Sequence, residues 1–167
     1  DALFAHVSPV DSPSGLLATI AMPASVPIDL ADASLIVLDG VQDPGNLGSL
    51  LRTAAAAGIR HALLGEGCAQ AWSPRALRAG MGAQFVVCIE EGCALLARLE
   101  RYRGRCLATA LREDARPLYE LDLNGPVAWL FGAEGQGLSP ALLARADRCV
   151  TIPMAAGIES LNVAAAA

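Results

Sequence analysis

From residue 34 onward, short apolar runs alternate with longer stretches in which apolar residues recur at helical spacing. The apolar runs are SLIVLD (34–39), RHALLG (60–65), AQFVVCI (83–89), RCLATA (105–110), PVAWLF (126–131) and RCVTIP (148–153). Their length and their flanking turn residues are typical of buried strands. The helical stretches cover 47–57, 74–80, 93–103, 139–146 and about 160 to the end. This order predicts an α/β fold with a mainly parallel sheet and helices on both faces.

The first 33 residues differ from the rest of the chain. Pro9, Pro13, Pro23 and Pro27 interrupt them, and each proline removes a backbone donor and favours extended conformations before it. We therefore expect a linker-like lead-in at 1–33, with room for one edge strand and no helix. Residues 34–167 then form one domain, as the chain length allows.

Composition narrows the class of protein. With 54% hydrophobic and 17% charged residues, the chain is not disordered, and a large buried or interfacial surface favours self-association. A net charge of -5 argues against an autonomous nucleic-acid binder, so any RNA must be held locally or by another part of a larger protein. We find no membrane span and no signal peptide, which favours the cytoplasm.

Cysteine and histidine spacing gives no sign of a metal site. The five cysteines form no CxxC pair, and neither of the two histidines lies in a ligand motif. We expect no metal ion, and mostly buried thiols in a reducing compartment.

Three loops follow predicted strands and carry the candidate chemistry. They are DGVQDPGN (39–46), GAEGQGLS (132–139) and PMAAGIESLN (153–162). In parallel sheets ligands bind outside the carboxyl ends of the strands, so we expect these loops to form the site.

The first loop opens a helix whose only charge is Arg52. Asn46 is suited to cap this helix. On a helical wheel Arg52 points away from the leucine stripe. Its neighbours on that side are small: Gly48, Ser49, Ala55 and Ala56. A bulky partner could therefore approach the guanidinium, although an ordinary solvated arginine fits the same pattern.

The second and third loops also allow two interpretations. Glu134 lies among Gly132, Gly135 and Gly137 and would repel phosphate, so a neutral or cationic ligand or a plain turn fits better. In the third loop, Ser160 can cap a helix or, with Asn162, line an adenine or ribose pocket.

Taken together, three stretches resemble a known family. NLGSLLRTA with its preceding DP, LFGAEGQGLS and IPMAAGIESLNV resemble, in order and spacing, the signature motifs of the SpoU (TrmH-like) RNA ribose 2'-O-methyltransferases of the SPOUT superfamily. The resemblance covers roughly 34–167, and WSPRALRAGMGAQF (72–85) is also similar to the stretch between the family's motifs.

The resemblance implies a deep trefoil knot in the carboxy-terminal portion, an exception to the rule against threaded chains, S-adenosylmethionine as cofactor, and a homodimer. By motif match, the catalytic positions are Asn46, Arg52, Glu134, Ser160 and Asn162. The cofactor-binding positions are Thr109, Leu130, Gly132, Glu134, Gly137, Ile152, Met154, Ser160, Leu161 and Asn162. Because arginine is a poor base in water, we expect Arg52 to bind phosphate and stabilise alkoxide charge.

The implied activity is methyl transfer from S-adenosylmethionine to a ribose 2'-hydroxyl in RNA. The linker-like start favours ribosomal over transfer RNA, because it resembles the end of a linker from an added RNA-binding domain. Family members usually continue the last helix beyond the SLNV motif, so we expect the helix from residue 160 to be incomplete here. The alternatives are a SPOUT base methyltransferase and a non-catalytic, cofactor-binding RNA module.

Overall fold

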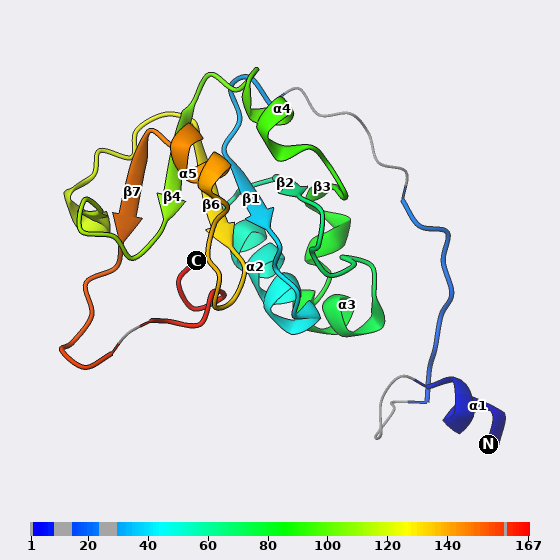
Figure 1. The fold of residues 1–167 in the computed structure, drawn as a ribbon. Helices are drawn as coiled ribbons and strands as arrows, with labels where there is room; N and C mark the ends of the chain where they lie inside the picture. The colour runs from blue at the N-terminus through cyan, green and yellow to red at the C-terminus, as the bar shows by residue number, and fades with distance from the viewer. Residues whose placement is uncertain (1, 9–14, 24–29, 159) are drawn as a thin grey trace.

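A seven-stranded sheet forms the centre of the computed structural model, which describes residues 2–8, 15–23, 30–158 and 160–167 (Figure 1). The strands are β1 (Leu35–Asp39), β2 (His61–Leu64), β3 (Cys88–Glu90), β4 (Arg105–Thr109), β5 (Arg116–Pro117), β6 (Val127–Gly132) and β7 (Arg148–Thr151). Their order is β3-β2-β1-β6-β4-β7-β5, and every pair is parallel. The predicted parallel sheet is confirmed. β5 was not predicted; it is an edge strand, where Pro117 removes no needed donor.

Helices cover both faces of the sheet, as predicted. α2 (Pro44–Ala56) and α3 (Pro74–Gly80) lie on one side, and α4 (Leu95–Leu99) and α5 (Pro140–Arg145) lie on the other. The alternation of side chains along β1 separates the two layers. Leu38 packs in the cluster that contains α2, whereas Val37 packs in the cluster that contains α4 and α5.

α2 and α3 approach each other very closely at Gly48. A Cβ on Gly48 would lie 2.4 Å from the carbonyl oxygen of Ala76 and 2.7 Å from the Cβ of Ala79. Only glycine leaves room for that backbone. The expectation that Gly48 clears space beside Arg52 for a partner is therefore wrong, because α3 occupies that space.

Two predicted elements are shorter than expected. Residues 83–85 form a 3-10 turn before β3 instead of a strand, because Gly82 takes a left-handed φ of 92° and turns the chain. Phe85 and Val86 are exposed, whereas Val87 and Ile89 are buried, so the apolar run is only partly buried. The helix expected at 93–103 is limited to α4, because the backbone N–H of Cys93 donates to Leu64 in β2.

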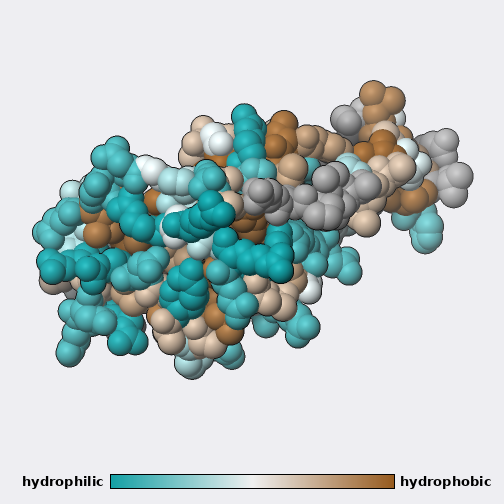
Figure 2. All heavy atoms as spheres, turned by 90° about the horizontal axis from the view of Figure 1, so that it is seen from above, coloured by the Kyte–Doolittle hydropathy of each residue, from teal (hydrophilic) through white to brown (hydrophobic). Residues whose placement is uncertain are grey.

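The lead-in and the last residues also differ from expectation. α1 (Ala2–Val7) is a short helix in the lead-in, possible because the first proline is residue 9. Residues 15–23 are exposed and without regular structure, and Leu16, Leu17, Ile20 and Met22 are among the exposed large hydrophobic residues. Figure 2 shows hydrophobic surface both on the projecting amino-terminal part and on the domain. The other prolines named above, except Pro23, lie outside the described residues. Instead of a helix from 160, a single turn follows Asn162. Two backbone hydrogen bonds hold this turn, too few to offset the free-energy cost of starting a helix.

None of the helices in the described part of the chain has the length and apolar character needed to cross a membrane.

Candidate functional site

The three candidate loops converge at the carboxyl edge of the sheet. β1 pairs with β6, β6 with β4, and β4 with β7. The residues that end these strands are Asp39, Gly132, Thr109 and Thr151. Since neighbouring parallel strands end on the same edge, the loops that follow them must meet. This confirms the predicted meeting of loops, which Figure 1 shows beside α2.

A cleft of about 810 Å³ lies between these loops. Its lining includes most positions predicted for the cofactor: Thr109, Gly132, Glu134, Gly137, Ile152, Met154, Ser160, Leu161 and Asn162. It also includes Leu118, Trp129 and Val163, which sequence analysis did not single out. Volumes of about 300 to 1,000 Å³ with mixed apolar and polar lining are usual for small-molecule sites.

Gly132 allows the second loop to fold back on its own strand. A Cβ there would lie 2.1 Å from the carbonyl carbon of Gly137 and 2.2 Å from the nitrogen of Leu138. Ala133 and Gly137 exchange two backbone hydrogen bonds, of 3.1 and 2.8 Å. The loop is therefore a tight turn whose backbone faces the cleft, and any side chain at 132 would collide with the backbone of this turn.

Hydrogen bonds join the three loops into one network. The Asn46 amide nitrogen donates to Glu134 Oε1 at 2.7 Å, and the Asn162 amide nitrogen donates to Asn46 Oδ1 at 3.0 Å. The backbone N–H of Gln42 donates to the other Glu134 oxygen at 3.4 Å. Residues more than 80 positions apart in the sequence thus share one polar cluster at the mouth of the cleft.

Asn46 is free to join this network because it does not cap α2. Asp43 is the N-cap, and its Oδ1 accepts the N–H of Asn46 at 2.8 Å. The expectation that Asn46 caps the helix is wrong. Pro44 indicates the correct cap, because proline favours the first position of a helix and the residue directly before it, Asp43, is then the N-cap.

Arg52 lies apart from the other predicted catalytic residues. It is exposed on α2 and does not line the cleft. It is six residues from Asn46, roughly 9 Å along the helix axis. Among the described residues it has no ion-pair partner. Ser160 lines the cleft and is exposed, and it caps no helix in the described chain.

Two further residues hold the edge in place. The Thr109 hydroxyl donates to the carbonyl oxygen of Leu130 at 2.9 Å, which ties β4 to β6. Leu130 itself is buried and outside the cleft lining. Asp39 was missed by sequence analysis: its carboxylate accepts the N–H of Ser139 at 2.8 Å, just before α5. Asp39 and Ser139 are 100 positions apart in the sequence, so no local sequence pattern predicts their contact.

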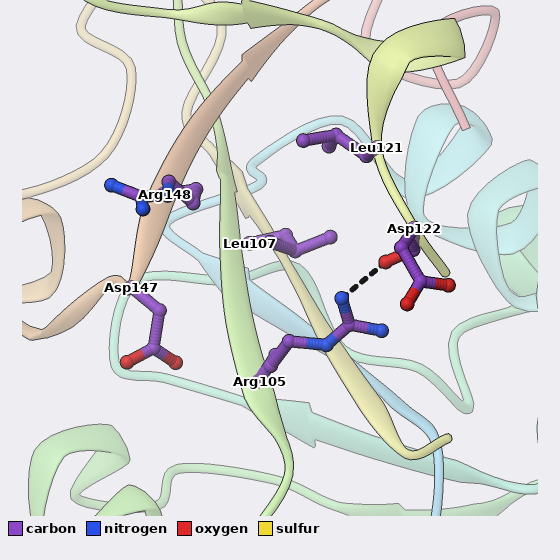
Figure 3. A pocket seen from close by; sticks show the side chains of 6 residues that line it. All are labelled: Arg105, Leu107, Leu121, Asp122, Asp147 and Arg148. Atoms are coloured by element: carbon purple, nitrogen blue, oxygen red, sulfur yellow. Dashed lines mark hydrogen bonds between the residues drawn. The ribbon is translucent and has the colours of Figure 1, made fainter. Parts of the chain in front are cut away.

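A second hollow, of about 510 Å³, lies near the opposite ends of β4 and β7 (Figure 3). It is lined by Arg105, Leu107, Leu121, Asp122, Asp147 and Arg148. The Arg105 guanidinium donates to the carbonyl oxygens of Asp122 and Asn124. Its donors therefore serve the turn at 122–125, and the hollow offers no free polar cluster comparable to that at the cleft.

Two half-buried cysteines beside the sheet, Cys68 and Cys93, donate hydrogen bonds as thiols. Cys68 Sγ donates to Leu38 and Cys93 Sγ donates to Leu64, each at 3.2 Å. Burial raises the pKa of Cys68, and burial followed by the nearby Glu90 carboxylate raises the pKa of Cys93 to about 11. Neither thiol is a nucleophile at neutral pH. Within the described ranges, His, Cys, Asp and Glu side chains form no group of three suited to a metal ion.

A parallel sheet whose motif-bearing loops surround a cleft at its carboxyl edge is the architecture of a ligand-binding α/β domain. The model of the SpoU rRNA Methylase family matches residues 33–167, and the chain belongs to this family. The resemblance stated from the three motifs is confirmed.

Relatives and solved structures agree with this assignment. The chain is 35% identical over 167 residues to the 23S rRNA (guanosine(2553)-2'-O)-methyltransferase RlmP of Bacillus subtilis, covering 98% of this chain and 66% of that protein. A TrmH-family structure from Porphyromonas gingivalis is 37% identical, with a TM-score of 0.83, covering 98% and 66% of the two chains. The AdoMet-bound rRNA methyltransferase of Sinorhizobium meliloti is 34% identical, with a TM-score of 0.75, covering 83% and 54%. The chain thus spans between half and two thirds of each.

Proposed function

We propose that this protein transfers the methyl group of S-adenosylmethionine to the 2'-hydroxyl of a ribose in ribosomal RNA. The observation that carries the proposal is the hydrogen-bonded series Asn162, Asn46 and Glu134, which joins all three family motifs beside the cleft. The names of the relatives, which specify rRNA and 2'-O methylation, support it.

The cleft suits S-adenosylmethionine in size and chemistry. Leu161, Ile152 and Met154 offer apolar contacts for an adenine ring, and the backbone at 132–138 offers hydrogen bonds. Glu134 places a carboxylate where a cationic ligand is favoured over a phosphate. When bound, the cofactor supplies an electrophilic methyl carbon on a positively charged sulfur.

The protein's own residues would orient the attacking ribose. With S-adenosylmethionine bound, the 2'-oxygen would take the methyl group in exchange for its proton, which would leave to solvent. The amides of Asn46 and Asn162 are held in fixed positions by Glu134 and by each other, so they can position a hydroxyl at low entropic cost. Arg52, outside the cleft, is suited to the RNA backbone beside the target ribose, where it offsets charge that develops in the transition state.

The remaining expectations form part of the same proposal. We propose a cytoplasmic homodimer that contacts through α2 and the carboxy-terminal residues, a trefoil knot in the carboxy-terminal portion, and a linker role for residues 1–33. Ile158, exposed in the third loop and outside the cleft lining, supports an apolar contact of this kind.

The experiment is a methyl-transfer assay on unmodified, in vitro transcribed 23S rRNA, with calorimetric measurement of S-adenosylmethionine binding. Nuclease digestion and mass spectrometry of the product locate the methyl group. Methylation of a ribose supports the proposal, and methylation of a base would identify a SPOUT base methyltransferase instead. Cofactor binding without transfer would identify a non-catalytic module.

A further inference from the structure

Arg75, at the start of α3, lies over the first turn of α2. Its Nη2 is 2.8 Å from Asp43 Oδ2, and its side chain is 69% exposed. A Cβ built on Gly45 would lie 3.8 Å from Nη2 and 3.9 Å from Nε of Arg75. The guanidinium is therefore close to Gly45, which is half-buried, on the side of α2 that faces away from the sheet.

Arg52 lies on the same side of α2. Positions 45, 49 and 52 recur at helical spacing, so Gly45, Ser49 and Arg52 form one stripe. From Gly45 to Arg52 is about 10 Å along the helix axis. The exposed guanidinium groups of Arg52 and Arg75 thus border this stripe. Asn46, which belongs to the hydrogen-bonded network, lies next to Gly45 at one end of the stripe.

Asp43 holds Arg75 without exhausting its donors. The ion pair joins one terminal nitrogen to Asp43, whereas a guanidinium has five N–H donors in a rigid fork. The same Asp43 caps α2 through its other oxygen. The pair therefore fixes the guanidinium at the helix start and leaves a side of it exposed. An arginine held in this way is well suited to a phosphate group.

We propose that Arg75 binds a backbone phosphate of the substrate RNA next to the nucleotide served by Arg52. The inference rests on the proposed function, because the strand must pass the Asn46 network to reach the cleft. A single RNA strand that lies along Gly45, Ser49 and Arg52 contacts both guanidinium groups. Such a contact contributes affinity without reading the base sequence.

The test measures how binding of a fluorescently labelled single-stranded RNA depends on salt. Each phosphate contact on a single strand contributes about 0.7 to the slope of log affinity against log salt. Arg75→Gln should reduce this slope by about 0.7 and weaken binding to RNAs of different sequence alike. Arg60→Gln is the matched control. Arg60 is exposed and directly precedes β2, at the amino edge of the sheet, opposite the edge that holds the cleft.

Asp43→Asn separates phosphate binding from a structural role. It weakens the same ion pair but keeps an oxygen to cap α2, so the slope should stay at the parental value. An unchanged slope in Arg75→Gln, or an equal loss in Asp43→Asn or Arg60→Gln, would overturn the proposal. Methyl transfer by the parental protein is measured in parallel. Its absence would overturn the proposed function, whereas the slopes decide the Arg75 contact separately.

Discussion

β4 and β7 border a hollow at each end, and the two hollows are built very differently. At the carboxyl end, Thr109 and Thr151 lead into the cleft, which is lined by glycine-rich backbone and by the loops that carry Glu134 and Asn162. At the other end, Arg105 and Arg148 line the smaller hollow (Figure 3). The Arg105 guanidinium donates hydrogen bonds to carbonyl oxygens of the neighbouring turn.

The difference shows why a charged hollow is not by itself a site. In the smaller hollow, charged side chains stabilise the turn that forms its wall. In the cleft, a glycine turn and a shared amide network bring polar groups from three loops to one place. Backbone that approaches closely can bind a ligand whose shape it matches. We therefore expect substitutions at the two ends to separate function from stability.

The largest effect is expected for Gly132→Ala. The added Cβ would lie 2.1 Å from the carbonyl carbon of Gly137, so the loop must move. We expect loss of detectable S-adenosylmethionine binding by calorimetry, and a fall of roughly 1 to 3 kcal/mol in the free energy of unfolding. Gly125→Ala is the control, because Gly125 lies outside the cleft lining and nothing lies within 4 Å of its Cβ, although its φ is +85°. It should cost only the strain of that φ, roughly 1 to 2 kcal/mol, and cofactor binding should persist.

Next in size is the effect of Arg52→Ala on methyl transfer. Arg52 is exposed and outside the cleft, so stability should change by less than about 0.5 kcal/mol and cofactor affinity should be retained. The transfer rate should fall at least roughly a hundredfold, the scale of losing a positioned charge near a developing oxyanion. Arg52→Lys should restore little, because an ammonium lacks the bidentate fork. A parental rate in the alanine variant would show that Arg52 is an ordinary surface residue.

The sequence predicted the sheet and the edge that holds the cleft, because buried strands and glycine turns leave local patterns. Five of the six predicted strands lie within a residue or two of the observed ones. The α2 cap was misassigned to Asn46, since asparagine and aspartate both cap helices, although Pro44 favoured Asp43. The close packing of α3 against Gly48 and the hydrogen bond between Asp39 and Ser139 could not be predicted. They depend on packing between elements that only the folded chain brings together.

A smaller effect, on stability alone, is expected for Arg105→Gln. The variant loses guanidinium hydrogen bonds to Asp122 and Asn124, and solvent competes for these exposed carbonyls. The free energy of unfolding in urea should therefore fall by about 1 kcal/mol, with methyl transfer unchanged. Arg148→Gln is the control: its side chain lines the same hollow but makes no hydrogen bond or ion pair with the described residues. If Arg105→Gln reduced transfer but not stability, the smaller hollow would belong to the functional site.

The smallest effect concerns pH and Cys93. Burial, followed by the nearby Glu90 carboxylate, raises the pKa of this thiol from 9.0 to about 11. The folded state therefore keeps its proton to higher pH than the unfolded state does. The resulting contribution to stability is fully present below pH 9 and is lost as the pH rises through about 11. Urea unfolding at pH 8, 9, 10 and 11 should show a decline over the upper part of this range that is shallower in Cys93→Ala. Cys88→Ala, at an exposed position on β3, should follow the parental curve. An identical decline in Cys93→Ala would show that other buried groups, such as Cys106 and Tyr102, account for the alkaline loss, since burial raises the pKa of both.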